Sequence, residues 1–445
     1  MSVTISPDLG PSEVAQRAQR NIAAVLAILA AVVAALLAAP SGAVFDLWGC
    51  LTCAYVVGLF VFQNSFLEWP VLPAHVVAIV TSALLALVAP TVLQALGLFT
   101  GFWRLTAIAL DLVVASATYQ CMVRPVPVHI AAGALSGRTY VVTGCNTGIG
   151  LETARALALG GARVVFACRS EAKARAAMQL LLRQEAGAVS EDQLVFLPLD
   201  VSSLASVRKF VDLLGEAKLD VHVLVLNAGV MLNNRLLSED GLEMTMASNH
   251  FGHFLLVLLL LPRLLEAEGR GEKPRIVVLG SSICYRHNRF DFGEIVAAKG
   301  EQDRKALLAR PYTMFRAYGQ SKMANVMFAA ELARRLRAKG SQIPANVVHP
   351  GEVNTDVMRD MNPVIVRLNQ TFKLVMYAAL KNCRQGAACT LHVATAPSLA
   401  EASGGSGLFF ARSAPALLTK ALTDEEAAKR LWQLSERLTG TASPI

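Results

Sequence analysis

The run TYVVTGCNTGIGLETARALALGG, which begins at Thr139, constrains the fold of this chain more than any other feature. A strand-like stretch leads into Gly144, Gly148 and Gly150, and a helical pattern follows at once. The spacing is TGxxxGxG, rather than the common GxGxxG. Glycine lets a backbone approach a ligand closely, and the N–H groups and dipole at a helix N-terminus favour phosphate. The run therefore predicts a turn that binds the pyrophosphate of a dinucleotide. The cofactor-binding candidates in it are Gly144, Cys145, Asn146, Thr147, Gly148, Ile149 and Gly150.

Further apolar runs alternate with helical patterns along the second part of the chain. Nearly continuous apolar runs are typical of parallel strands that helices cover on both faces. The pattern predicts an α/β fold with a Rossmann-type, doubly wound parallel sheet, whose ligands bind at the carboxyl ends of the strands. The runs are 162-ARVVFACRS-170, 194-LVFLPLDVSS-203, 222-HVLVLNAGV-230 and 275-RIVVLGSSI-283.

The second strand ends at Cys168 and Arg169, where sites for NAD usually carry an acid. A guanidinium matches the oxygens of a 2′-phosphate, so Arg169 favours NADP(H) over NAD(H), although it can also be an ordinary surface arginine. The next strand ends at Asp200 and Val201, which are expected near the adenine. After the following strand, the backbone of Asn227, Ala228 and Gly229 is expected to approach the cofactor.

The run 318-YGQSK-322 opens a helical pattern, so Tyr318 and Lys322 share one helix face. Carbonyl reduction needs a hydride on carbon and a proton on oxygen, and a tyrosine of pKa near 10 must become more acidic to act near neutrality. A neighbouring ammonium lowers that pKa. The pair is therefore a candidate acid/base site, with Ser281 and Ser282 at a strand end beside it.

The order TGxxxGIG, DVSS, NAG, N-x-x-G, SS, YxxxK and HPG-x-x-x-T resembles the short-chain dehydrogenase/reductase family over roughly residues 136–440. Finer features resemble the retinol dehydrogenases and the oxidoreductase domain of the WW-domain-containing oxidoreductase. These features are ACR at 167–169, 249-NHFGHFLL-256, 349-HPG-351 and the closing RLWQLSERL.

The resemblance implies that Tyr318 is the acid/base and that Lys322 lowers its pKa and holds the nicotinamide ribose. Ser282 would polarise the substrate oxygen. Asn249 would complete a proton relay through water, or else be a structural amide where a long apolar helix begins. Around the nicotinamide carboxamide and phosphates, the resemblance places Pro350, Gly351, Val353 and Thr355.

Residues 22–122 are predicted to form a transmembrane region of four helices, between a tail at 1–21 and a linker at 123–135. The first stretch, 22–39, has no charge and is long enough to span a membrane. A cleaved signal peptide is an alternative for that stretch alone, and Arg104 and Asp111 make the last span, near 102–122, the weakest. With four spans, the flanking arginines place both ends in the cytosol, whereas three spans would place the catalytic domain across the membrane. We expect this region to act as an anchor in the endoplasmic reticulum.

Three of the 41 basic and five of the 33 acidic residues lie in 1–123, which leaves 38 and 28 for the soluble part. The basic residues are scattered without interleaved aromatic residues, so a nucleic-acid partner is not expected. No metal site is expected, because the Cys50–Cys53 pair lies in an apolar run with no second ligand pair nearby, and the histidines lack metal spacing. His250, His253 and His349 are interpreted as packing or hydrogen-bonding residues.

The expected function is NADP(H)-dependent interconversion of a lipophilic alcohol and its ketone or aldehyde at a membrane. Residues 357–382 are expected to cover the substrate and to dock on the membrane face. The alternative is a catalytically weak or inactive cofactor-binding scaffold or sensor, and a homo-oligomer stays open. A final packing helix is expected at 423–438, with a capping box of Thr423 and Glu426.

Overall fold

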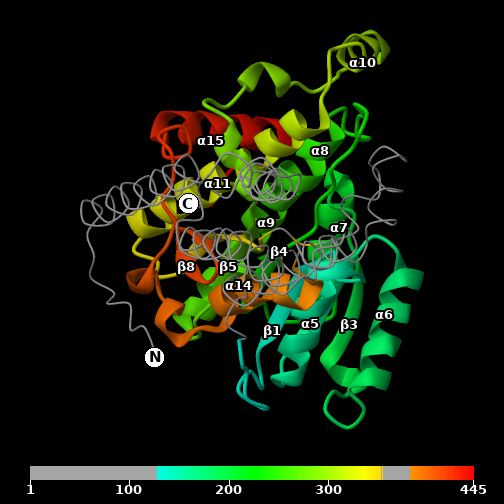
Figure 1. Cartoon of the computed structure of the whole chain (residues 1–445), viewed down its shortest axis with the longest axis vertical. Helices are drawn as coiled ribbons and strands as arrows, with labels where there is room; N and C mark the ends of the chain where they lie inside the picture. The colour runs from blue at the N-terminus through cyan, green and yellow to red at the C-terminus, as the bar shows by residue number, and fades with distance from the viewer. Residues whose placement is uncertain (1–127, 352, 354–380) are drawn as a thin grey trace, which may run out of the picture. The chain divides into compact units, whose positions relative to one another are not determined.

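A computed structural model describes residues 128–351, 353 and 381–445 (Figure 1). The chain divides after Arg124 into two units, and the description concerns the second. The predicted tail, the predicted transmembrane helices and Thr355 lie outside the described residues, as does nearly all of the expected substrate cover at 357–382.

In this part of the chain, one sheet of eight strands has the order β3-β2-β1-β4-β5-β6-β7-β8. All neighbouring strands are parallel except β7 and β8. The strand order reverses at β1, which pairs with both β2 and β4, so the carboxyl end of β1 is the switch point where such sheets bind ligands. The doubly wound parallel sheet is confirmed. The strands are β1 (Thr139–Thr143), β2 (Arg163–Cys168), β3 (Leu194–Pro198), β4 (Val223–Leu226), β5 (Arg275–Leu279), β6 (Ala345–His349), β7 (Phe409–Ala411) and β8 (Ala414–Pro415).

Helices lie on both faces of this sheet (Figure 1). The α-helices are α5 (Gly148–Leu159), α6 (Glu171–Gln184), α7 (Leu204–Glu216), α8 (Met244–Met246), α9 (Gly252–Gly269), α10 (Glu301–Leu308), α11 (Met314–Ala338), α14 (Cys383–Thr395) and α15 (Glu425–Thr439). A π-helical turn covers Ala247–Phe251. Short 3-10 helices cover Glu191–Gln193, Ser282–Arg286, Phe292–Glu294, Pro397–Leu399 and Ala402–Gly404.

Strand β1 shows how the sheet serves two cores. Successive side chains of a strand point to opposite faces. Val141 packs in the core that α7, α9, α11 and α15 cover, while Tyr140 and Val142 pack in the core under α5, α6 and α14. All five residues of β1 are buried, which is why the sequence reads as an unbroken apolar run.

One stretch among the described residues, Met244–Gly269, has the length and hydropathy of a membrane span. Its apolar window is 89% buried inside the domain, between the sheet and the neighbouring helices α7 and α15. It is the core helix of this fold, because burial on all sides gives a helix the same apolar composition as a lipid-facing one.

The C-terminal helix α15 packs on α11 and α9, as expected. Trp432 contacts the rings of Phe254 and Phe328, at centroid distances of 5.1 and 5.9 Å. The predicted capping box is wrong, however. Asp424 is the N-cap and accepts from the backbone N–H of Ala427, while the Thr423 hydroxyl donates to the Thr419 carbonyl. Aspartate also has the favourable charge for the positive helix end.

Candidate active site

The glycine-rich turn follows β1 and opens α5. Gly144 and Gly148 have φ values of +66° and +63°, in the left-handed region that favours glycine. Gly150 is needed for space, because a Cβ there would lie 2.5 Å from the Asn227 amide nitrogen and 2.6 Å from the Gly144 carbonyl oxygen. The TGxxxGxG spacing therefore reflects two backbone conformations and one close approach.

The turn fits a dinucleotide phosphate. A Cβ built on Gly148 would meet no atom within 4 Å, so open space adjoins the backbone there. The side chain of Thr147, the N-cap residue, does not cap α5, which leaves the helix N-terminus to interact with an anion. The cofactor would be held by the backbone of Asn146, Thr147 and Gly148, whereas the Cys145 thiol is buried and donates to the Val142 carbonyl at 3.2 Å.

The loop after β4 is tied to this turn. The Asn227 side chain donates to the carbonyl oxygens of Thr143 and Gly144, at 2.8 and 3.2 Å. Ala228 lies against Gly144, and Gly229 is exposed. The structure thus brings the two predicted cofactor segments together, and the exposed backbone at Gly229 is what close approach to a ligand requires.

Arg169 directly follows β2, Asp200 lies two residues after the adjacent strand β3, and the two form an ion pair of 3.6 Å. The Arg169 side chain is 71% exposed, and Asp200 also accepts from the Ser202 hydroxyl at 2.6 Å. Val201 lies directly against Gly252, where a Cβ would collide with the Val201 carbonyl oxygen. This contact explains the glycine of the N-x-x-G motif.

Tyr318 and Lys322 lie one turn apart on α11, with the Lys322 ammonium nitrogen 5.5 Å from the centre of the Tyr318 ring. Lys322 is 3% exposed and donates to the Leu279 carbonyl at the end of β5, at 2.8 Å. Burial lowers the pKa of Lys322 to about 8. Gly319 follows Tyr318 because His287 occupies the space of a larger side chain.

Asn249 lies in the π-helical turn before α9 and is fully buried. Its side-chain oxygen accepts from the Val230 N–H at 2.8 Å, and its amide group donates to the Val230 carbonyl at 3.0 Å and the Ser321 hydroxyl at 2.9 Å. The structural-amide interpretation therefore describes its side chain. A Cβ on Gly229 would lie 3.2 Å from the Asn249 side-chain oxygen and 3.7 Å from the Lys322 nitrogen, so both residues lie beside the loop after β4.

Ser282 begins the short helix that follows β5, so it shares its strand end with the Leu279 carbonyl that holds Lys322. The Ser282 N–H donates to Nδ1 of His349, at 3.3 Å. His349 is buried at the end of β6 and stacks on Phe409. His349 is thus a packing and hydrogen-bonding residue, as expected, and its hydrogen bond positions the backbone of the candidate catalytic serine.

The segment after β6 converges on the glycine-rich turn. A Cβ built on Gly386, in the first turn of α14, would lie 2.7 Å from Val353 and 3.2 Å from Ile149. Gly351, with φ +86°, lies against the buried Lys381, whose backbone forms an isolated parallel β-bridge with that of Val353. Lys381 belongs to the segment 357–382 that was expected to dock on the membrane face, but its side chain is buried, at 8% exposed.

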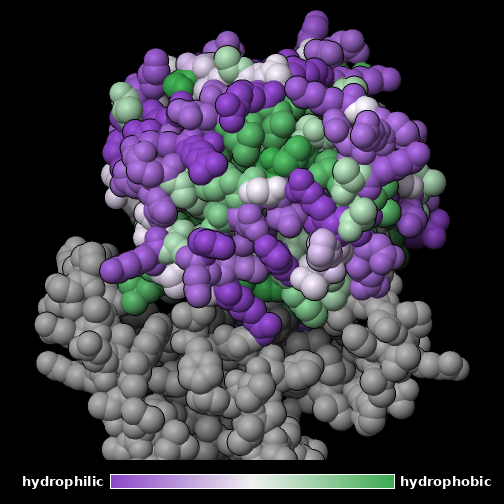
Figure 2. Space-filling model, turned by 90° about the horizontal axis from the view of Figure 1, so that it is seen from above, coloured by the Kyte–Doolittle hydropathy of each residue, from purple (hydrophilic) through white to green (hydrophobic). Residues whose placement is uncertain are grey.

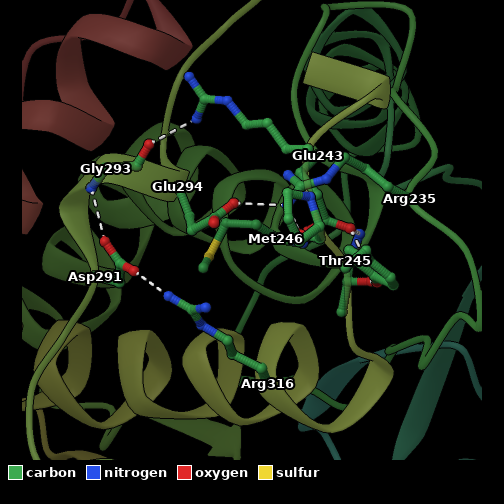
Figure 3. A network of polar contacts seen from close by, with 11 residues as sticks. Arg235, Glu243, Thr245, Met246, Asp291, Gly293, Glu294 and Arg316 are labelled. Carbon is green, nitrogen blue, oxygen red and sulfur yellow. Dashed lines mark hydrogen bonds and ion pairs between the residues drawn. The ribbon is translucent and has the colours of Figure 1, made fainter. Parts of the chain in front are cut away.

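One ion pair joins the segments that follow β4 and β5, and a second joins the segment after β5 to α11 (Figure 3). Arg235 pairs with Glu294 at 2.7 Å, and Arg316 pairs with Asp291 at 2.5 Å. Arg316 lies two residues before Tyr318 on α11, so the second pair connects the start of this helix to the segment after β5. The face seen in Figure 2 carries an apolar area among hydrophilic side chains. The exposed large apolar residues of these segments are Leu236, Val296, Leu308 and Phe315.

Comparison with known proteins agrees with this geometry. A family model described as short chain dehydrogenase matches residues 138–299. A WW domain-containing oxidoreductase of Danio rerio is 38% identical over 310 residues, 68% of this chain and 69% of that protein. Retinol dehydrogenase 14 of Homo sapiens is 34% identical over 318 residues, 69% of this chain and 88% of that protein. Polyprenol dehydrogenase of Mus musculus is 37% identical over 305 residues, 68% of this chain and 84% of that protein.

Proposed function

Since the chain belongs to the short-chain dehydrogenase/reductase family, we propose that it interconverts a lipophilic alcohol and its ketone or aldehyde, with NADP(H) as the cofactor. The observation that carries the proposal is the buried Lys322 ammonium beside the Tyr318 ring, at the strand end where Ser282 follows. The cofactor, when bound, supplies or accepts the hydride.

Tyr318 acts as the general acid in reduction and as the general base in oxidation. In reduction its hydroxyl proton passes to the substrate oxygen while the substrate carbon is reduced. The phenolate left behind is stabilised by the Lys322 ammonium, which is held at the Leu279 carbonyl. Because Lys322 is removed from water, its charge acts on Tyr318 with little screening.

Ser282 orients the substrate oxygen toward Tyr318, and Asn249 with Lys322 returns the proton to Tyr318 through water. The short helix after β5 aims Ser282 from the same strand end that holds Lys322, which supports a shared site. The side chain of Asn249 is committed to Val230 and Ser321, so we assign the water contact of the relay to its backbone.

Arg169 supports the choice of NADP(H). Its guanidinium lies at the carboxyl end of β2, is largely exposed, and has Asp200 on one side. A bound 2′-phosphate would pair with the guanidinium in place of Asp200, because a dianion competes well with one partly buried carboxylate.

Three observations support a lipophilic substrate taken from a membrane. Two similar proteins are called retinol dehydrogenase 14 and polyprenol dehydrogenase, and retinol and polyprenol are apolar alcohols. Residues 22–39 are long and apolar enough for a membrane anchor. Leu236, Val296, Leu308 and Phe315 are exposed on the segments that follow β4 and β5. We place the domain on the cytosolic face of the endoplasmic reticulum, held by the multi-span region at 22–122 and covered by residues 357–382.

The test is oxidation of NADPH and NADH by the purified full-length protein, in detergent, against a panel of retinoid, steroid and other lipid carbonyls. We expect NADPH-dependent reduction of at least one member of the panel. Cofactor binding without turnover of any carbonyl, or of the matching alcohols with NADP⁺, would favour the scaffold or sensor instead.

A further inference from the structure

His253 lies in the first turn of α9, directly behind the site, and is 1% exposed. Its Nε2 lies 2.9 Å from the Thr143 hydroxyl oxygen, and its Nδ1 lies 3.2 Å from the Asn249 carbonyl oxygen. The ring therefore joins the last residue of β1, under the glycine-rich turn, to a candidate catalytic residue.

The partners determine the direction of each hydrogen bond. A carbonyl oxygen only accepts, so Nδ1 carries the proton and donates to Asn249. Nε2 is then an acceptor for the Thr143 hydroxyl proton, and the other possible acceptor, the Val225 carbonyl, is farther away at 3.5 Å. Burial lowers the pKa of His253 to about 4, so the ring is neutral and this single tautomer satisfies both contacts.

The Thr143 oxygen completes the connection to the cofactor loop. It accepts from the backbone N–H groups of Asn227 and Ala228, both at 2.9 Å. Since its own proton points to His253, its lone pairs are left for these two amides. The chain of contacts thus runs from the Asn249 carbonyl through His253 and Thr143 to the loop that faces the cofactor.

We propose that His253 is a positioning residue that couples the cofactor loop at Asn227–Gly229 to the proton-relay residue Asn249. The proposal rests on the proposed function in assigning the relay to Asn249. One contact of the ring fixes the loop against which the cofactor lies. The other fixes the Asn249 carbonyl in the π-helical turn, a type of helix irregularity that occurs often at functional sites.

His250 provides a matched control three residues away. It is equally buried, at 1% exposed, and burial also lowers its pKa, to about 3. Its Nε2 lies 2.9 Å from the Ser435 hydroxyl of α15, and its ring packs on Phe254 and Phe328. A change at His250 therefore also disturbs a fully buried ring, but its hydrogen-bond partner lies on α15 and not under the cofactor loop.

The experiment compares His253→Phe, His253→Gln and His253→Asn with His250→Phe in the full-length protein. Glutamine places an acceptor near the former Nε2, and asparagine places a donor near the former Nδ1. The measurements are amide hydrogen exchange of the Asn227–Gly229 segment without cofactor, the Kd for NADPH, kcat at saturating NADPH, and Tm.

For His253→Phe we expect faster exchange at the Asn227 and Ala228 amides. We also expect about tenfold weaker NADPH binding and about tenfold lower kcat, because each loses the effect of about one hydrogen bond of His253. Glutamine should restore slow exchange and NADPH affinity but not kcat, and asparagine should restore kcat but not affinity. His250→Phe should lower Tm alone. If His253→Phe does not fold, the glutamine and asparagine variants carry the comparison.

Equal effects of His253→Phe and His250→Phe on exchange and Kd would overturn the proposal, as would glutamine and asparagine variants that behave alike. The exchange measurement needs neither cofactor nor substrate. A protein that turns over no carbonyl thus refutes the proposed function while the exchange pattern still decides the role of His253.

Discussion

The Lys322 ammonium donates to the Leu279 carbonyl oxygen at 2.8 Å, and this bond joins the helix of the YxxxK pair to the end of β5. The Asn325 side chain donates to the same oxygen at 3.1 Å. One strand-end carbonyl therefore aligns a full turn of α11. A positive charge so deeply buried costs stability, and we infer that it is retained for its action on Tyr318.

Replacing Lys322 by Met should therefore raise stability while it abolishes turnover. The folded pKa is about 8 and the usual value is 10.5, so the unfolded chain binds a proton that the folded chain resists. The gain should be full, at about 3 kcal/mol, below pH 8, and should vanish as the pH rises to 10.5. Urea unfolding of both proteins at pH 7.5 and pH 10 measures it. A gain of equal size at both pH values would show that the buried charge is not its cause.

The substitution Gly150→Ala should weaken NADPH binding by about tenfold to a hundredfold. Its Cβ would lie 2.5 Å from the Asn227 amide nitrogen and 2.6 Å from the Gly144 carbonyl, so the turn and the cofactor loop must separate. Gly269→Ala is the control, since a Cβ there meets nothing within 4 Å. Fluorescence titration with NADPH compares them, and an unchanged Kd for Gly150→Ala would contradict the assigned cofactor turn.

The substitution Arg169→Ala should raise the Kd for NADPH by about tenfold or more and leave the Kd for NADH nearly unchanged, because only NADPH carries the 2′-phosphate. Arg163→Ala is the matched control, an exposed arginine at the other end of β2. Calorimetric titration with both cofactors measures the difference. Equal losses for NADPH and NADH would reject the phosphate contact.

Acid should destabilise the fold through its buried histidines. The pKa values of His250 and His253 are about 3 and 4, against 6.5 in the unfolded chain, so only the unfolded chain takes up these protons below pH 6.5. Stability should fall between pH 6.5 and pH 4, by about 1.4 kcal/mol per pH unit for each histidine. Urea unfolding of His250→Phe should show the smaller slope. The same slope in both proteins would mean that His250 is not the proton acceptor.

The sequence predicted features that lie within one element or its flanking turn. These features are the glycine-rich turn, the apolar strands and the i, i+4 relation of Tyr318 and Lys322. Each depends on residues that are close along the chain, so the sequence alone predicts it. The placement of Thr143 against His253 joins residues 110 positions apart, and no local pattern records it.

Other differences have local physical reasons. The cap of α15 is Asp424, whereas the sequence predicted Thr423. Both side chains can cap a helix and they are neighbours, and a sequence pattern does not resolve a helix end to one residue. Asn249 was expected in a relay or as a structural amide, and from the π-helical turn its side chain hydrogen-bonds to Val230 and Ser321. Lys381 was expected on a membrane-docking segment, but it is buried and pairs with Val353, a contact between distant residues that no local pattern predicts.

The central claim is that Tyr318 transfers the proton, and the substitution Tyr318→Phe tests it most directly. Phenylalanine keeps the ring beside Lys322 and removes only the hydroxyl. The initial rate of NADPH oxidation should be compared at saturating NADPH, with a lipid carbonyl that the wild-type protein reduces. We expect turnover to fall by about a hundredfold or more while the Kd for NADPH changes less than about threefold. Turnover equal to that of the wild-type protein would contradict the assignment of Tyr318 as the acid/base.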